Sequence, residues 1–63
     1  MIGETIKCHK INSGYKQDYG FVDCKVTQVI TLNGIPTIKV LQQGGWNELL
    51  AWYKNNERVL DLD

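Results

Sequence analysis

The sequence predicts a small, mainly β domain in which the elements follow the order β-β-β-α-β. Two observations lead to this fold class. Apolar and polar residues alternate along several short segments, as they do in half-buried strands. An Asn33-Gly34 pair lies between two of these segments, and such a pair is the strongest short signal for a β-hairpin.

The first strand is expected over residues 4–11, because Ile6 and Cys8 fall on one face and polar residues on the other. Residues 12–20 follow no such period and are rich in turn-forming Asn, Ser, Gly and Asp. We therefore expect a loop of about nine residues there, and loops of this length often carry function.

A long second strand is expected from Phe21 to Leu32, where apolar residues occupy most of the even positions. At ~3.3 Å per residue it would extend for about 40 Å, which is longer than a domain of this size is wide. We therefore expect a bend or bulge near residues 27–29.

The hairpin that follows has two possible registers. A two-residue turn pairs Ile30 with Thr37, whereas a three-residue loop pairs Ile30 with Ile38. We favour the second register because it brings more apolar side chains together. Pro36 lacks an N–H group, so it belongs at the start of the third strand or on an edge.

Gly44-Gly45 ends the third strand, and the next apolar residues are spaced as on a helix. They fall at positions i, i+3, i+4 and i+7, namely Trp46, Leu49, Leu50 and Tyr53. This spacing predicts a short helix over about residues 46–54, with Trp46 and Tyr53 facing the core. Asn55-Asn56 suits a left-handed helix exit, and residues 58–62 alternate again as a closing strand with Leu60 and Leu62 inward.

Four antiparallel strands, one of them bent, with a helical turn before the last, resemble the layout of SH3-like and OB-like barrels. We therefore expect either a small antiparallel sheet or a partly open barrel of that kind. Residues 1–63 can form only one domain, and a chain this short has a thin stability margin, so a partner or a homo-oligomer is a reasonable expectation.

The composition is that of an ordinary globular domain, with 43% hydrophobic and 22% charged residues. No apolar run approaches the ~20 residues of a membrane span, and residues 1–4 lack the pattern of a signal peptide, so we expect a cytoplasmic protein with no membrane partner. The formal net charge is zero, which provides no overall attraction to nucleic acid. The frequent Ile, Lys, Asn and Tyr residues suit an AT-rich genome such as many phages carry.

We expect Cys8 and Cys24 to be reduced and buried, as is usual in the cytoplasm. The alternatives are a disulfide between them or a metal ion held by Cys8, His9 and Cys24. The metal is the weaker alternative, because consecutive strand residues point to opposite faces and no fourth ligand is evident. We expect no cofactor.

The sequence contains no recognisable catalytic pattern. His9 is the only imidazole, and its position between lysines on the polar face of the first strand indicates a solvated surface histidine. The acidic residues show no paired spacing, and there is no phosphate-binding loop or Cys-x-x-Cys. We therefore expect a binding protein and not an enzyme.

One segment, residues 17–24, is similar to the RNP1 octamer of RRM and cold-shock domains. Four central positions, Tyr-Gly-Phe-Val, match the motif, and Gln, Asp and Cys replace its basic, glycine and last aromatic positions. The resemblance implies that Tyr19 and Phe21 stack on bases. The other interpretation is that both rings cover the rim of a small core.

The leading hypothesis is a small protein-interaction module, such as an inhibitor or other modulator that docks on a larger protein or assembly. The alternative is a single-stranded nucleic-acid-binding module built on the RNP1-like segment, with lysines contacting phosphates. The helical placement leaves Trp52 at the side of the helix, where it is either a core flank or an exposed anchor. The predicted binding residues are Tyr15, Lys16, Tyr19, Phe21 and Trp52.

Overall fold

The computed structural model describes residues 1–63 and consists almost entirely of five strands. They are β1 (Thr5–Asn12), β2 (Gln17–Leu32), β3 (Ile35–Gln42), β4 (Glu48–Lys54) and β5 (Glu57–Asp61). The only helical element is a single 3-10 turn, η1 (Ser13–Tyr15). No helix in the structure is long and apolar enough to cross a membrane.

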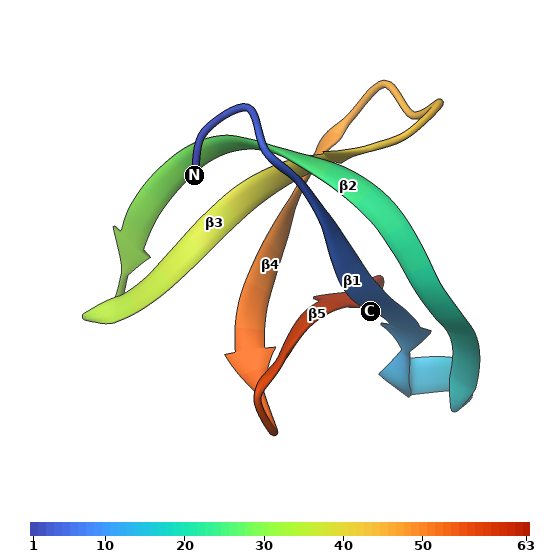
Figure 1. The fold of residues 1–63 in the computed structure, drawn as a ribbon. Helices are drawn as coiled ribbons and strands as arrows, with labels where there is room; N and C mark the ends of the chain where they lie inside the picture. The colour runs from blue at the N-terminus through green and yellow to red at the C-terminus, as the bar shows by residue number, and fades with distance from the viewer.

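The strands close into a barrel in chain order, and each pairs antiparallel with the next (Figure 1). The pair that closes the barrel, β1 with β5, is parallel, because the first and last of five alternating strands run in the same direction. This connectivity is a simple meander and differs from the Greek-key order of an OB barrel. The structure therefore confirms a small β domain of the barrel type, although it is closed.

The bend predicted near residues 27–29 is present as a β-bulge. Val26 pairs with Val40, but Gln28 pairs with Lys39, so Thr27 is an extra residue in β2. Figure 1 shows the result, since β2 arches over the whole molecule and joins both halves of the barrel. The bulge explains how one continuous strand of 16 residues fits a molecule whose longest extent is 29 Å.

The β2–β3 hairpin turns through Asn33 and Gly34, whose φ angles of 51° and 78° are both left-handed. The turn therefore has two residues, and Ile30 pairs with Thr37. The three-residue loop favoured from the sequence is wrong. The bulge in β2 shifts the alternation by one residue, so Val26 and Ile38 still reach the core in the two-residue register.

The helix predicted over residues 46–54 is also wrong, because β4 occupies Glu48–Lys54 and pairs with both β3 and β5. Leu50 and Trp52 on the outer face of β4 are partly buried, as Leu49 on the inner face is, so its apolar residues do not alternate strictly and fall by chance on a helical spacing. Asn55 and Asn56, with φ angles of 53° and 63°, form a second two-residue hairpin turn. Trp46 and Tyr53 were expected to face the core, but neither reaches it. They are 95% and 63% exposed.

The loop between β1 and β2 is shorter than predicted. It contains η1 and Lys16, and β2 begins at Gln17, four residues before the predicted start. The side chain of Asn12 accepts a hydrogen bond from the Tyr15 N–H, 3.3 Å, and Lys16 closes the turn with a left-handed φ of 53°. The turn-forming residues therefore make one tight turn in place of a long loop.

The core is small and lies inside the barrel, with contributions from every strand. It contains no aromatic side chain and consists of Cys8, Cys24, Val26, Ile38, Val40, Ala51 and Leu60. Both cysteines are free, as expected, and burial raises the pKa of the Cys8 thiol to about 12. His9 lies on the opposite face of β1 from Cys8, so these residues do not converge on a metal ion.

Candidate functional site

Tyr15 and Lys16 lie at the turn between β1 and β2, at one end of the barrel. The Tyr15 ring is 77% exposed, and its backbone is held by the Asn12 cap. Lys16 is exposed, and its N–H donates to the Ser13 carbonyl, 3.3 Å. The turn thus presents an aromatic ring and a cation on a rigid backbone.

Tyr19 and Phe21 lie on opposite faces of the β1–β2 pair. Between them Gly20 adopts a left-handed φ of 76°, and the β1–β2 register shifts at this point. Phe21 stacks on His9, with 4.8 Å between ring centroids, whereas the Lys10 Nζ lies 5.4 Å from the centroid of Tyr19. Consecutive strand residues point to opposite faces, so the side chains of His9 and Lys10 do so. Phe21, which contacts His9, and Tyr19, which contacts Lys10, therefore lie on opposite faces.

This separation bears on the resemblance to RNP1. Base stacking in that motif uses aromatics two positions apart on one face of a strand. Here the bulge at Gly20 turns the Tyr19 ring away from Phe21, and the Tyr19 hydroxyl donates to the Gln17 side chain, 2.7 Å. The two rings are 50% and 57% exposed, but they do not form one stacking platform.

His9 is not the freely solvated histidine that its sequence position indicates. Its Nδ1 lies 2.9 Å from the Glu57 Oε2 and its Nε2 lies 2.8 Å from the Asp18 Oδ1. Both nitrogens must be protonated to donate to two carboxylates at once. These contacts raise the pKa of His9, and the contact with Glu57 has the largest effect. Its ring joins β1 to β2 and β5, a long-range arrangement that no local sequence pattern signals.

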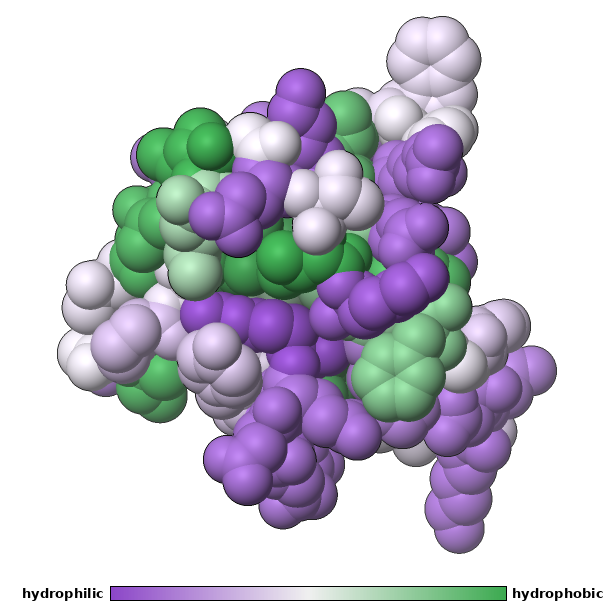
Figure 2. Space-filling view, viewed as in Figure 1, coloured by the Kyte–Doolittle hydropathy of each residue, from purple (hydrophilic) through white to green (hydrophobic).

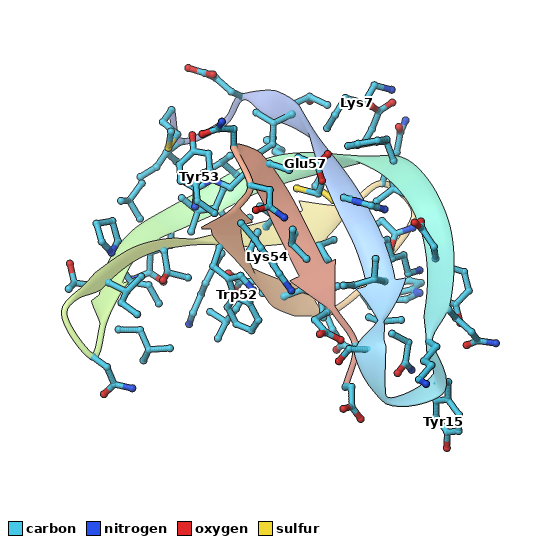
Figure 3. The ribbon with its side chains drawn as sticks, turned by 90° about the horizontal axis from the view of Figure 1, so that it is seen from below. Lys7, Tyr15, Trp52, Tyr53, Lys54 and Glu57 are labelled. Carbon is cyan, nitrogen blue, oxygen red and sulfur yellow. The ribbon has the colours of Figure 1, made fainter.

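Trp52 lies on β4, where it pairs with Val59 of β5 and is only partly exposed. It lines a cleft of about 270 Å³ that opens where β4 and β5 diverge, together with Leu49, Leu50, Leu60 and Leu62. In Figure 3 Trp52 lies on the β4–β5 hairpin and Tyr15 at the distant β1–β2 turn. The five predicted binding residues are therefore distributed over separate parts of the surface.

Two exposed aromatic residues were missed because they were assigned to a helix. Trp46 lies in the loop between β3 and β4 and is the most exposed large hydrophobic residue of the chain. Gly44, with a φ of 83°, and Gly45, whose N–H donates to the Gln42 carbonyl at 2.8 Å, form the turn before it. The Gly44-Gly45 pair could have predicted this exposure, because a Trp directly after a turn, in a short loop, is far from the core.

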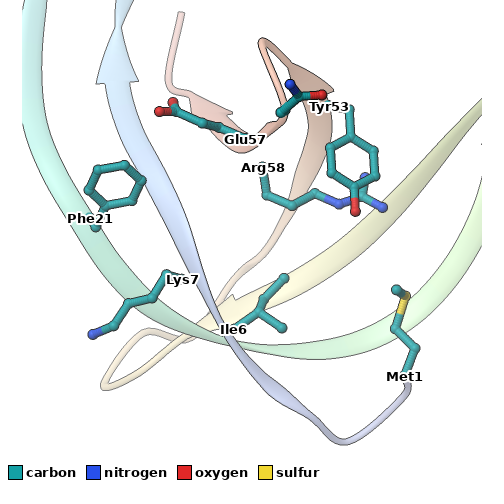
Figure 4. Close-up of a pocket in the computed structure, with 8 residues that line it drawn as sticks. Met1, Ile6, Lys7, Phe21, Tyr53, Glu57 and Arg58 are labelled. Carbon is teal, nitrogen blue, oxygen red and sulfur yellow. The ribbon is translucent and has the colours of Figure 1, made fainter.

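Tyr53 borders a cavity of about 320 Å³ between β1 and the β4–β5 hairpin (Figure 4). The cavity exists because β1 and β5 begin to pair only at His9 and Val59, so the preceding residues diverge. The Arg58 guanidinium covers the Tyr53 ring at 3.8 Å from its centroid. The lining of the cavity includes both apolar and charged side chains, among them Met1, Ile6, Lys7, Phe21 and Glu57.

Comparisons of the chain with protein-family models, curated proteins and solved structures find no match. The function must therefore be argued from the surface of the barrel itself.

Proposed function

We propose that this chain is a protein-interaction module that docks on a larger protein or assembly and modulates it without catalysis. One observation carries the proposal. The chain has six aromatic residues, none of them in the core, and five are at least half exposed. These are Tyr15, Tyr19, Phe21, Trp46 and Tyr53.

Aromatic rings supply more burial energy than any other side chains, so a small domain normally uses them in its core. This domain instead builds its core from aliphatic residues and thiols and leaves the rings in water. Tyr, Trp and Phe are also the residues most enriched in protein interfaces and at their energetic centres. The arrangement is thus the one expected of a domain whose aromatic residues are buried by a partner.

The charges beside the rings favour a protein partner over a nucleic acid. Lys7 pairs with Asp23, 2.7 Å, and Lys10 donates to the Gln42 side chain, 3.2 Å. Asp18 contacts the same His9 ring on which Phe21 stacks, so a carboxylate lies near this ring and disfavours phosphate there. With seven basic and seven acidic side chains the net charge is zero, so the chain has no overall positive field of the kind that attracts nucleic acid.

The direct experiment places a photoreactive benzoylphenylalanine at position 46 or 15 and irradiates cells of the native host. We expect discrete protein adducts from both positions, because both side chains project into solvent. The matched control carries the same group at Lys54, an exposed residue at the end of β4 that lies outside both loops. Adducts that are equally abundant from the control position would contradict the proposal.

A second measurement separates the two partner classes. The purified chain is passed over immobilised single-stranded DNA and RNA at low and high salt. We expect no retention at either salt concentration, since retention that falls with salt is the property of phosphate contacts. Salt-dependent retention that Lys16→Ala weakens would replace the proposal with the nucleic-acid-binding alternative.

A further inference from the structure

The end of the β2–β3 hairpin extends beyond the barrel as an arm, which we define as residues 27–37 (Figure 1). On one side β1 pairs with β2 only as far as Lys25, and residues 3 and 4 extend this contact to Val26. On the other side β4 pairs with β3 only from Ile38 onward. Within the arm each strand therefore has one neighbour, and both of its edges are open.

The two open edges of the arm differ in what they can bind. Leu32 and Ile35 flank the two-residue turn and form the first hydrogen-bonded pair, so the outward amides belong to alternate residues. On the β2 edge these residues are Val29 and Thr31, each with an N–H and a carbonyl. On the β3 edge the corresponding residue is Pro36, which has no N–H. Only the β2 edge can pair with a complete further strand.

The arm is also unusual in its side chains. Residues 26–38 include no charged residue, in a chain that is 22% charged. Val29, Leu32 and Ile35 are 52%, 42% and 59% exposed. Figure 2 shows hydrophobic residues gathered on the side of the molecule where the N-terminus and the second half of β2 lie. Exposed edge strands are normally protected by charges, prolines or bulges, and beyond the bulge at Thr27 the β2 edge has neither a charge nor a proline.

We propose that a second copy of this chain covers the β2 edge, with the two edges paired antiparallel about a twofold axis. A charge-free segment meets itself without repulsion, which makes it complementary to its own copy. Because Pro36 closes the other edge, the pairing ends at two chains and does not propagate into a fibre. The proposal uses neither Tyr15 nor Trp46 and does not depend on the function proposed above.

The twofold axis lies beside Ile30, so that Val29 faces Thr31 of the second copy. Both residues direct their N–H and carbonyl groups outward, and this register satisfies about four backbone hydrogen bonds. The two arms then form one four-stranded sheet whose exposed aliphatic side chains pack together. Burying these side chains and the adjoining backbone from both copies removes on the order of 1,000 Å², the lower range for a specific interface.

Sedimentation of the pure chain tests the proposal. We expect a mass of 14.4 kDa, twice the 7.2 kDa of one chain, over a wide range of concentrations. Val29→Lys places two cations beside the axis and should give a folded monomer. The matched control, Thr5→Lys, adds the same charge at an exposed position of β1 and should remain a dimer. A wild-type chain that is monomeric at every concentration overturns the proposal.

A charge-pairing experiment tests the register. Thr31→Glu alone should weaken the dimer, and mixing it with Val29→Lys should restore a 14.4 kDa species, because the two substituted side chains face each other. Amide exchange gives an answer even if these variants fold poorly. In wild type the Val29 and Thr31 amides should exchange slowly at high concentration, and rapid exchange of both in the folded protein overturns the proposal.

Discussion

His9 connects three strands through one imidazole ring. It belongs to β1, its two nitrogens contact Asp18 of β2 and Glu57 of β5, and Phe21 stacks on its face. The two carboxylates stabilise the imidazolium. The Gly20 N–H donates to the Asp18 Oδ1, 2.7 Å, and this bond holds the Asp18 carboxylate in place. The cluster therefore helps to hold β5 against β1, where the barrel closes.

This cluster makes the stability of the fold depend on pH. The folded pKa of His9 is raised above 6.5, so its contribution is complete below that value and is lost as the pH rises through the raised pKa. The folded pKa of Asp18 is lowered below 3.8, so its contribution is lost as the pH falls through the lowered value. The melting temperature should therefore decline as the pH rises above about 6.5 and through the raised pKa of His9, and His9→Gln should flatten this decline. An equally steep decline in His9→Gln would show that another group is responsible.

Gly34 provides a test of backbone conformation at a single residue. Its φ of 78° is left-handed, and nothing lies within 4 Å of the position a Cβ atom would occupy. Gly34→Val should therefore destabilise the fold by more than about 1 kcal/mol through backbone strain alone. D-alanine at this position, introduced by chemical synthesis of the chain, should cost nothing, because a D-residue favours positive φ. Equal loss in both chains would mean that space, and not φ, limits the turn.

At the scale of elements, β4 explains most of what the sequence could not predict. Period-two alternation and the Asn33-Gly34 pair correctly predicted β1, the bent β2, the second hairpin strand and β5. For β4 the alternation is masked, since Leu50 and Trp52 on its outer face are also partly buried. Its pairing with β3 is a tertiary effect, and such effects override the local preference for strand or helix.

The candidate site was also predictable only in part, because tertiary contacts decide how its side chains are arranged. Tyr15, Tyr19 and Phe21 were predicted as binding residues, with packing on the rim of the core as the other interpretation for Tyr19 and Phe21, and each is at least half exposed. Their separation was not predictable, because it depends on the bulge at Gly20 and on which face of β1 each ring meets. Trp46 was misplaced only because β4 was taken for a helix, and an exposed Trp after a Gly-Gly turn is consistent with a loop.

Two tryptophan substitutions test the assignment of β4. Trp46→Ala should change the free energy of unfolding by less than about 0.5 kcal/mol, because the ring is almost fully exposed. Trp52→Ala should cost about 1–3 kcal/mol, because its ring is partly buried and lines the cleft between β4 and β5. The helical interpretation places Trp46 in the core and predicts the opposite order. Chemical denaturation of both variants decides between them.

The whole molecule depends on a short closing contact. Only three residue pairs join β1 to β5, from His9–Val59 to Ile11–Asp61, and the Leu62 N–H extends the contact to the Ile11 carbonyl at 2.9 Å. The Ser13 N–H adds a bond to the Asp61 carboxylate, 3.1 Å. The core inside the barrel is a single cluster to which every strand contributes. Separation of β5 from β1 therefore exposes the centre of the molecule.

Cys8 and Cys24 report this opening directly. Both are completely buried at the centre of the barrel, and the pKa of Cys8 is raised to about 12, so the folded protein holds unreactive neutral thiols. With iodoacetamide, intact-mass measurement should show unlabelled and doubly labelled chains and almost none labelled once, because the first adduct does not fit the closed core and keeps the second thiol exposed. The labelling rate should follow the equilibrium fraction of globally unfolded chain as denaturant is added, because iodoacetamide reacts slowly compared with refolding. Single labelling of Cys8 at a rate independent of denaturant would instead mean that β5 separates from β1 while the rest of the barrel stays folded.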